Sequence, residues 1–240
     1  MTADYISKID YQPQNISNQI CDLLKQAIMR NELQGGEQIV EMALQKKLGV
    51  SRSPIREAFR ELEKLGLVEI EPRKGTFVKK ITIQDIRENY LVRAPLEGLA
   101  AVEASVHMDE NDYKRLDKAI EGMRSAAHKN EITNYWICHK NFHETFIHAC
   151  GNRLLINLLS LLRTHSVRHR LAFPLPGEDL NASVKIHEKM IQMFMDQKAD
   201  KKILQEFVTQ HILVILPAFL ENASKLTPYQ NTEMEQPVSN

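Results

Sequence analysis

Residues 49–59 read GVSRSPIREAF and stand between two short amphipathic segments. Ser53 is a favourable helix N-cap, and Pro54 suits the first helical position because its missing N–H would have no partner there. From this point apolar side chains recur at helical spacing and predict one buried face: Ile55, Phe59 and Leu62. The stretch therefore predicts a turn followed by a helix that packs on one side.

Basic side chains predict a second face on the same helix. Arg52 precedes the expected N-cap, and Arg56, Arg60 and Lys64 follow at intervals of four residues. A short helix with one packed face and one row of guanidinium groups suits a DNA major groove, where arginine can donate two hydrogen bonds to guanine O6 and N7. A solvated surface helix would show a similar basic row, so the flanking segments must decide between the two interpretations.

The flanking segments favour DNA binding. Residues 41–48 predict a short helix that ends at Gly49, a residue that readily adopts the left-handed conformation. Residues 66–78 contain two β-branched and aromatic runs around a turn-rich segment, which predicts a hairpin. The basic tip of this hairpin is expected to reach a phosphate or the minor groove, through Arg73, Lys74 and Gly75.

Upstream, residues 15–31 predict a helix that covers the core of the same domain with one apolar face: Ile16, Ile20, Leu23, Leu24, Ala27 and Ile28. Residues 15–80 together resemble the winged helix-turn-helix of GntR-family transcriptional regulators, with the family-like string SRSPIREA at 51–58. Met42 departs from the family pattern, because members often carry arginine there. The expected DNA contacts are Arg52, Ser53, Arg56 and Arg60, with Arg73, Lys74 and Gly75 in the wing.

The composition of the whole chain limits its class. Its 240 residues suffice for two small domains, and its formal net charge of zero excludes a general polyelectrolyte attraction to nucleic acid. Residues 1–80 carry a net charge of +2 (13 basic and 11 acidic), and residues 81–240 carry −2 (18 and 20). We expect neither a membrane span nor a signal peptide, and three cysteines without a disulfide-like pattern favour the cytoplasm.

From residue 81 onward the pattern predicts helices only. Six segments are expected: 83–106, 109–127, 131–150, 152–173, 180–197 and 199–223. The predicted protein is mainly α. A winged helix-turn-helix at 1–80 precedes an all-α bundle of about six helices at 81–225, and 226–240 is expected to be a disordered tail.

Four histidines on three of these predicted helices point into the bundle: His139, His143, His187 and His211. A single inward histidine is usually a hydrogen-bonded core residue, but four such rings would each need a polar partner. A shared metal would satisfy them together, and neutral imidazole suits Zn, Ni, Cu or Fe. The spacing alone leaves both interpretations open.

The second domain resembles the FadR-type ligand-sensing domain, called FCD, of a large GntR subgroup. The resemblance implies a divalent transition metal, with Zn or Ni favoured, bound by these four histidines. His139 departs from the family pattern, where aspartate is usual. The resemblance also implies that Arg93 faces the effector, although a pair with Glu97 at i and i+4 would explain it equally. His165 and Arg168 are further candidates for the same effector site.

The sequence thus predicts a DNA-binding transcriptional regulator, in the repressor class, and not an enzyme. The expected effector is a small carboxylic or sugar acid that binds near the metal. Because one helix-turn-helix reads only a half-site, we expect a homodimer and a palindromic operator in double-stranded DNA. Two alternatives remain: a metal-dependent, hydrolase-like enzyme, for which no catalytic spacing is present, and a DNA-binding protein whose helical domain is purely structural.

Overall fold

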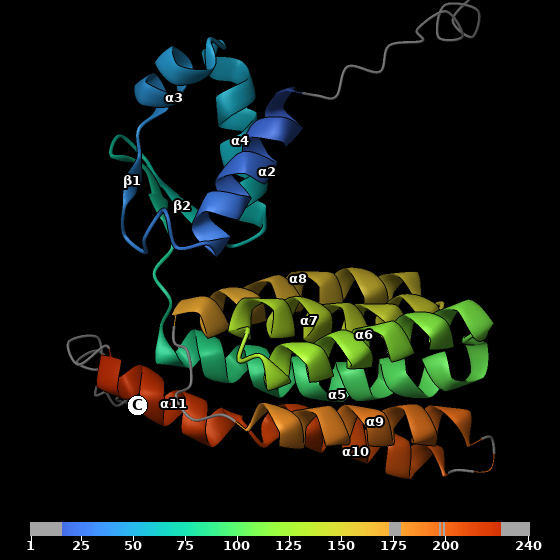
Figure 1. Ribbon diagram of the computed structural model, residues 1–240. Helices are drawn as coiled ribbons and strands as arrows, with labels where there is room; N and C mark the ends of the chain where they lie inside the picture. Colours follow the sequence, from blue (N-terminus) through green and yellow to red (C-terminus); the bar gives the residue numbers. More distant parts are fainter. Residues whose placement is uncertain (1–15, 173–178, 197, 199, 227–240) are drawn as a thin grey trace, which may run out of the picture. The chain divides into compact units, whose positions relative to one another are not determined.

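The structure of this chain is a computed structural model that describes residues 16–172, 179–196, 198 and 200–226. The chain divides into two compact units between Ile81 and Thr82. Within these described residues, the first unit contains three helices and a small sheet, and the second contains helices only (Figure 1). The expectation of a mainly α protein with a winged helix-turn-helix ahead of a helical domain is confirmed.

The N-terminal unit has the element order of a winged helix-turn-helix. Its elements are α2 (Ile16–Met29), β1 (Gln38–Ile39), α3 (Glu41–Leu48), α4 (Arg52–Lys64), β2 (Val68–Glu71) and β3 (Gly75–Val78). The strands form one antiparallel sheet in the order β1-β3-β2, and the β2–β3 hairpin closes with Glu71 opposite Gly75. The sequence did not predict β1, because a strand of two residues has no measurable periodicity.

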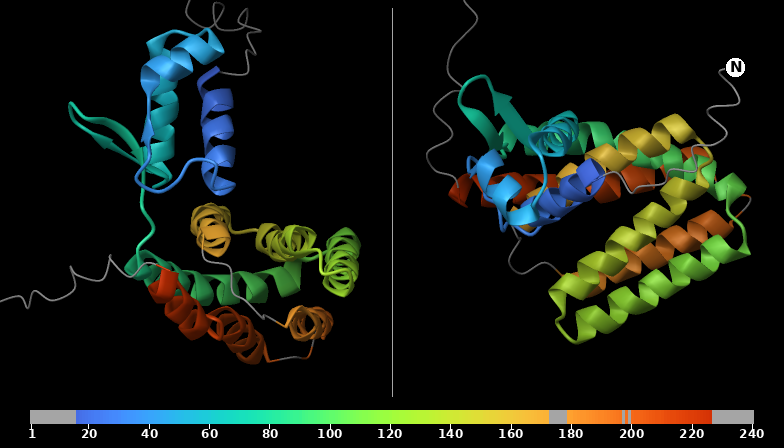
Figure 2. Two further views of the ribbon diagram at one scale, coloured as in Figure 1. Left: turned by 60° about the vertical axis from the view of Figure 1, so that its left-hand side comes forward. Right: turned by 90° about the horizontal axis from the view of Figure 1, so that it is seen from above.

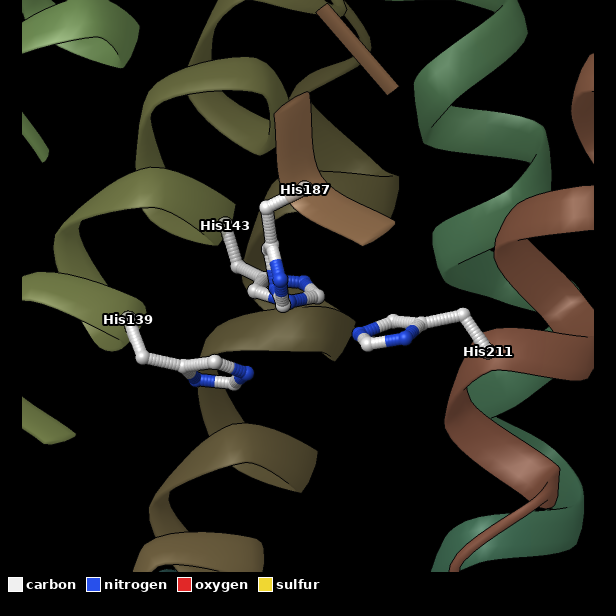
Figure 3. A group of neighbouring side chains, drawn as sticks. All are labelled: His139, His143, His187 and His211. Carbon is white, nitrogen blue, oxygen red and sulfur yellow. The ribbon is translucent and has the colours of Figure 1, made fainter. Parts of the chain in front are cut away.

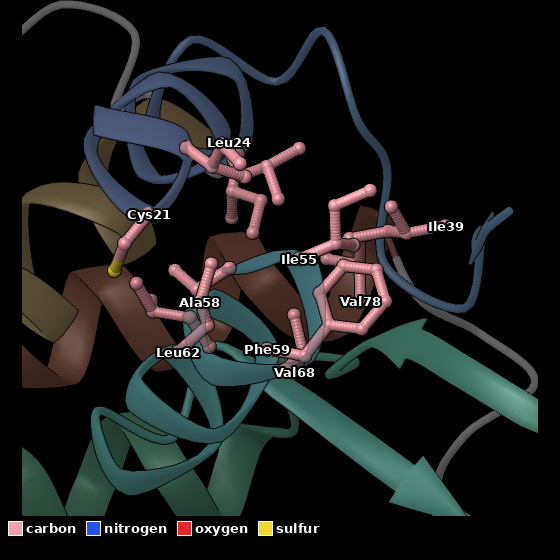
Figure 4. Packing of buried hydrophobic residues seen from close by; sticks show 12 residues of the cluster. Cys21, Leu24, Ile39, Ile55, Ala58, Phe59, Leu62, Val68 and Val78 are labelled. Atoms are coloured by element: carbon pink, nitrogen blue, oxygen red, sulfur yellow. The ribbon is translucent and has the colours of Figure 1, made fainter. Parts of the chain in front are cut away.

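The core of this unit lies between α2, α4 and the sheet (Figure 4). Ile55, Phe59 and Leu62 are buried as predicted. The predicted face of α2 is partly wrong, because Ile16 and Leu23 are 47% and 53% exposed. The buried side of that helix instead holds the following residues: Ser17, Ile20, Cys21, Leu24 and Ile28.

The start of α4 differs from the prediction. The N-cap is Ser51, in an extended conformation, so the helix begins at Arg52, two residues earlier than expected. Ser53 is therefore inside the first turn, where its hydroxyl donates to Glu57 Oε1 at 3.3 Å. Pro54 is still tolerated, because the first N–H groups of a helix lack intrahelical acceptors. Gly49 ends α3 in the predicted left-handed conformation, with φ of 66°.

Among the described residues the second unit contains seven helices rather than about six: α5 (Ile83–His107), α6 (Glu110–His128), α7 (Ile132–Ala149), α8 (Arg153–Ala172), α9 (Leu180–Met195), α10 (Lys201–Leu213) and α11 (Leu216–Leu226). The last predicted helix is divided into α10 and α11. Pro217 explains the division, because it has no N–H to donate to the carbonyl of Leu213. The expected loop at Pro174–Gly177 and the tail beyond Leu226 lie outside the described residues.

Helix α5 organises the helical unit. It packs against α8 on one side and against α10 and α11 on another (Figure 2). A side chain at Gly98 would meet Thr209 Oγ1 at 2.5 Å, so only glycine permits this approach of α5 and α10. The helix continues through Pro95, which leaves the carbonyl of the half-exposed Leu91 without its intrahelical donor.

The stretch Lys201–Lys225 is more apolar than we expected from the sequence, with a mean hydropathy of 1.6. Its length and composition alone would permit a membrane span. The turn between α10 and α11 interrupts it, and Leu204, Val208 and Ile212 are buried within the bundle. It is weak evidence for a membrane, because core helices pass the same test.

Candidate functional site

Two of the predicted DNA-contacting arginines converge on one carboxylate. Arg56 Nε donates to Glu41 Oε2 at 2.9 Å, and Arg52 Nε lies 3.7 Å from Glu41 Oε1. The arginine side chains remain 62% (Arg52) and 59% (Arg56) exposed, so both can still reach a ligand. Arg60 is also exposed on α4. The two helices of the helix-turn-helix are therefore linked by an ion pair on their polar side.

The wing carries its predicted basic tip. Arg73 adopts a positive φ of 66°, and Lys74 Nζ pairs with Glu71 Oε2 at 2.8 Å. Gln38 of β1 donates from Nε2 to the carbonyl of Lys74 at 2.8 Å and thereby ties the tip to the sheet. A side chain on Gly75, whose φ is 125°, would meet the same amide at 2.6 Å. The positive φ and the nearby Gln38 amide therefore require glycine at position 75, and the sequence did not reveal this requirement.

The four predicted histidines come together in the helical unit (Figure 3). His139 and His143 project from α7, His187 from α9 and His211 from α10. One ligand atom of each ring lies within 4.8 Å of the others, and His143 and His187 are 1% and 0% exposed. Side chains up to 72 positions apart in the sequence (His139 and His211) thus form one all-nitrogen cluster, buried or partly buried, that could hold a metal.

Hydrogen bonds orient two of the rings. His143 Nδ1 lies 2.6 Å from Glu97 Oε2, and His187 Nδ1 lies 2.7 Å from the carbonyl of Ser183. Both acceptors require a proton on Nδ1, so each Nε2 presents a lone pair. The two Nε2 atoms face each other at 3.2 Å. Two lone pairs at this distance repel, whereas a shared cation would stabilise them.

Burial keeps the rings in the form that binds metals. It lowers the pKa of His143 to about 4 and that of His187 to about 3, although Glu97 acts in the opposite sense on both. Burial also holds the pKa values of His139 and His211 well below the usual range. Neutral imidazole is the metal-binding species.

Glu97 is the central acidic residue of the site, and the sequence suggested for it only a pair with Arg93. Its side chain is fully buried, and Oε1 accepts from Arg163 Nη1 at 2.9 Å while Oε2 accepts from His143. Burial alone would raise the pKa of Glu97, but Arg163 and His143 hold it well below the ordinary value. The partners are 66 and 46 residues away in the sequence, so no local pattern could reveal them.

The predicted effector residues lie along the interface of α5 and α8. Arg93 Nε is 3.5 Å from Glu97 Oε1, and the Arg93 guanidinium stacks 4.6 Å from the centre of the Tyr90 ring. Arg168 is buried, which lowers its pKa, while Asp85 acts in the opposite sense. The ring of His165 lies 6.3 Å from that of His169, a buried histidine that the sequence analysis missed.

Polar residues continue along the same helix interface. Asn89 donates to the carbonyl of Leu162 at 3.0 Å and accepts from Ser166 Oγ at 2.6 Å. On α5 the buried or half-buried polar residues therefore recur every four positions: Asp85, Asn89, Arg93 and Glu97. This spacing could have identified a polar stripe on one face of α5, but its apolar neighbours obscured it.

The donor set fits a transition metal. In a tetrahedral site with metal–nitrogen distances of about 2.0–2.1 Å, neighbouring nitrogens stand about 3.4 Å apart. The 3.2 Å separation between the His143 and His187 nitrogens is close to that value, and the other pairs, which lie within 4.8 Å, would have to move closer together around a metal. A carboxylate behind a ligating histidine, as Glu97 is behind His143, is the usual orienting arrangement at metal sites.

Comparison with known families settles the class of the protein. The family described as bacterial regulatory proteins of the gntR family matches residues 16–78, and the FCD domain matches residues 88–213. The chain belongs to the GntR family and carries an FCD domain. GntR regulators bind DNA through this winged helix-turn-helix, so the chain is a transcriptional regulator.

Curated relatives agree with this family. The chain is 39% identical over 142 residues to the transcriptional regulator YdhC of Bacillus subtilis, which covers 59% of this chain and 63% of that one. It is 27% identical over 207 residues to a protein of Paenarthrobacter nicotinovorans named "Probable D-xylose utilization operon transcriptional repressor", covering 85% and 88%. The repressor RspR of Escherichia coli is 24% identical over 205 residues, covering 83% and 86%.

Solved structures show the same fold at low sequence identity. McbR/YncC of Escherichia coli has a TM-score of 0.72 at 16% identity, with 87% of this chain and 98% of that chain covered. A GntR regulator of Rhodococcus sp. RHA1 has a TM-score of 0.69 at 19% identity, with 85% and 97% covered. These similarities support the fold of this GntR regulator, not its ligands.

Glu144 and Glu188, which directly follow the candidate metal ligands His143 and His187, form ion pairs with basic side chains outside the histidine cluster. Glu144 pairs with Lys140 at 3.5 Å, and Glu188 pairs with Arg124 at 2.6 Å. Neither arrangement is that of a general base beside a metal-bound water. The relatives and families are regulators, which argues against the hydrolase-like alternative.

Proposed function

We propose that this GntR regulator is a cytoplasmic, homodimeric repressor whose affinity for a palindromic operator changes when a small carboxylate or sugar acid binds beside a metal in the helical unit. The observation that carries the proposal is the facing pair of Nε2 atoms in His143 and His187. One bound metal would explain the two facing Nε2 atoms, the neutral rings and the position of Glu97 behind His143.

The proposed metal is Zn or Ni, bound by His139, His143, His187 and His211. Trp136, the one tryptophan in the sequence, supplies a local probe, because its ring centre lies 4.9 Å from that of His139. Protein purified without a histidine tag is stripped with a chelator and titrated with Ni²⁺. We expect one equivalent to quench Trp136 fluorescence, and His187→Gln to abolish the saturable phase.

His148 supplies the matched control for this titration, because it is an exposed histidine on the same helix as His139. His148→Gln should bind Ni²⁺ as the unaltered chain does. A titration without saturation in the unaltered chain, or equal losses in the two variants, would contradict the metal site.

The effector proposal rests on charge and on unsatisfied donors near the cluster. Arg93 and Arg163 outnumber the single carboxylate of Glu97, and a divalent ion would add two further positive charges. Within the described part of the chain, Arg163 Nε and His211 Nδ1 are buried without a hydrogen-bond acceptor. A carboxylate can bind both a guanidinium group and a metal, and its oxygens can accept from such donors.

The relative named for a D-xylose utilisation operon makes sugar acids a reasonable first set of ligands. We expect a panel of small carboxylates and sugar acids, tested on metal-loaded protein, to contain members that raise the melting temperature and change DNA affinity. Arg93→Ala should abolish that rise while preserving DNA binding by the ligand-free protein. The contrary outcome is that Arg93→Ala unfolds the protein while no anion stabilises the unaltered chain. In that case the role of Arg93 is structural, namely its ion pair with Glu97.

The dimer proposal rests on exposed apolar side chains of two helices that pack against each other. On α5 the exposed residues are Leu91, Val92, Leu99 and Val106, and on α8 they are Leu154 and Leu158. Leu154 and Val106 are 69% and 67% exposed, and large exposed apolar side chains that gather on a surface mark protein–protein interfaces. A second copy of this chain would cover these faces and would place two helix-turn-helix units for one palindrome.

Light scattering on the purified chain tests this interface. Leu154→Lys combined with Leu158→Lys should convert a dimer into a monomer, since it places charges in a buried apolar contact. Ile137→Lys is the control, because Ile137 is a 52% exposed apolar residue on α7. Dimers that persist in the double variant, or a loss of dimers in the control alone, would place the interface elsewhere.

A further inference from the structure

Glu41 occupies an unusual place for an acidic residue on a surface that binds a polyanion. It is the first residue of α3, and its side chain is 25% exposed. Its two oxygens take one arginine each, Arg56 at 2.9 Å and Arg52 at 3.7 Å. A carboxylate in this position repels phosphate, so it weakens general attraction to DNA.

The atoms used in these contacts leave the useful edge of each guanidinium available. Both arginines approach Glu41 through Nε, and among the described residues no hydrogen bond engages their terminal Nη atoms. The two Nη groups form the edge that donates to guanine O6 and N7 together. Arg56, which is hydrogen-bonded at Nε, has lost part of its rotamer freedom before DNA arrives, and Arg52, at 3.7 Å, is restrained by charge attraction to the same carboxylate.

We propose that Glu41 is a positioning residue for base recognition: it holds Arg52 and Arg56 so that their terminal nitrogens read bases, and it suppresses their use as general phosphate contacts. The inference deepens the proposed function and rests on its DNA-reading part. It assigns to α3 a share in sequence discrimination that does not require any α3 side chain to touch a base. Met42, which follows Glu41 and is 70% exposed, is then not needed for that purpose.

The test measures discrimination rather than affinity alone. Full-length protein first selects its preferred sites from duplex DNA with a randomised centre. The affinity for the selected duplex is then divided by the affinity for the unselected pool at the same salt concentration. For Glu41→Gln we expect this ratio to fall at least about fivefold, because one bidentate guanine contact discriminates by about fivefold to a hundredfold. Binding to the pool should rise.

Glu61→Gln is the matched control. It removes the same charge from the same unit, and Glu61 pairs with Lys64 at 2.7 Å rather than with the two arginines. This control should strengthen binding to the pool and to the selected duplex alike, so its ratio should stay near that of the unaltered chain. Glu41→Asp keeps the charge but shortens the side chain, and it should lower the ratio as Glu41→Gln does.

The outcomes separate the inference from the proposed function. If the unaltered chain selects a sequence but either Glu41 variant keeps the same ratio as Glu61→Gln, Glu41 is not a positioning residue and the inference is wrong. If the unaltered chain selects no sequence at all, both the proposed operator recognition and the inference are wrong. Circular dichroism spectra of the variants verify that the N-terminal unit remains folded.

Discussion

Glu41 and Glu97 are two carboxylates that each hold basic side chains, one at the surface and one in the interior. Glu41 contacts Arg52 and Arg56, whose side chains are more than half exposed. Glu97 has no exposed surface and contacts Arg163 and His143, whose side chains are 9% and 2% exposed. Water screens the first set, so it can rearrange when DNA binds, whereas the second set depends on every partner for its solvation.

The two carboxylates therefore serve different purposes although both bind basic side chains. At the surface, an arginine can leave its carboxylate partner for a DNA base edge at a small cost in free energy, and this suits recognition. In the interior, loss of one charge leaves the others buried without compensation, so the site is rigid until an ion or ligand changes its charge balance. A metal and an anionic effector are species of that kind, and they can alter the interior set without unfolding the bundle.

The largest expected effect is the acid sensitivity of the interior set. The pKa values of the four clustered histidines are depressed, so between pH 6.5 and about 4 the unfolded chain binds protons that the native chain does not. The contribution of these histidines to stability should therefore be fully present above pH 6.5 and should be lost as the pH falls through about 4 towards about 3. Denaturant unfolding of the chelator-treated protein, followed by Trp136 fluorescence, measures this slope. His187→Gln should reduce the slope by about 1.4 kcal/mol per pH unit.

The control for the slope is His148→Gln, which changes an exposed histidine on the helix that carries His143. Equal slopes in the two variants would show that the buried cluster does not govern the acid response. The interior charges would then not differ from the surface charges in their response to pH.

The second expected effect is the cost of removing the interior carboxylate. Glu97→Ala leaves Arg163 and Arg93 in the core without their acidic partner, and breaking a buried pair in this way costs about 3–5 kcal/mol. Unfolding in urea, followed by Trp136 fluorescence, should show a lower midpoint. Glu144→Ala, which breaks the exposed pair with Lys140, should change the midpoint little. Similar midpoints for the two variants would mean that the interior charges are solvated by water.

The third effect concerns the surface set. Arg56→Ala should weaken binding to the selected duplex about fivefold to a hundredfold and should relax preference at one base position. Its stability should be unchanged, because the side chain is 59% exposed. Arg30→Ala is the control for charge, since Arg30 is 69% exposed and pairs with Glu32. A folded Arg56→Ala dimer with unaltered preference would remove Arg56 from the recognition surface.

Features that depend on neighbours in the sequence were predictable. The string 51–58, the left-handed Gly49 and the hairpin at 68–78 follow from local rules, and the four histidines follow from helical spacing on three segments. The start of α4 was misplaced by two residues, because Ser51 and Ser53 are equally good caps by composition and only the backbone distinguishes them.

Features that depend on distant contacts were not predictable. The partners of Glu97 come from α7 and α8, and the strand β1 exists only because it pairs with β3. The exposure of Ile16 and Leu23 was also missed, since the sequence shows the apolar side of a helix but not which part of it has something to pack against. The surface carboxylate Glu41 was missed for the same reason, as its contact with Arg56 spans 15 residues.

The smallest expected effect is that of Glu41→Gln on stability, and it sharpens the comparison most. Glu41 and its two arginines are exposed enough for water to replace their mutual attraction, so the loss should be less than about a quarter of that for Glu97→Ala. Thermal unfolding followed by circular dichroism measures both variants. A small loss of stability together with reduced base discrimination would show that this carboxylate acts in recognition. A loss as large as that of Glu97→Ala would instead make the α3–α4 ion pair a structural support, because a reduced discrimination would then follow from a displaced helix α4.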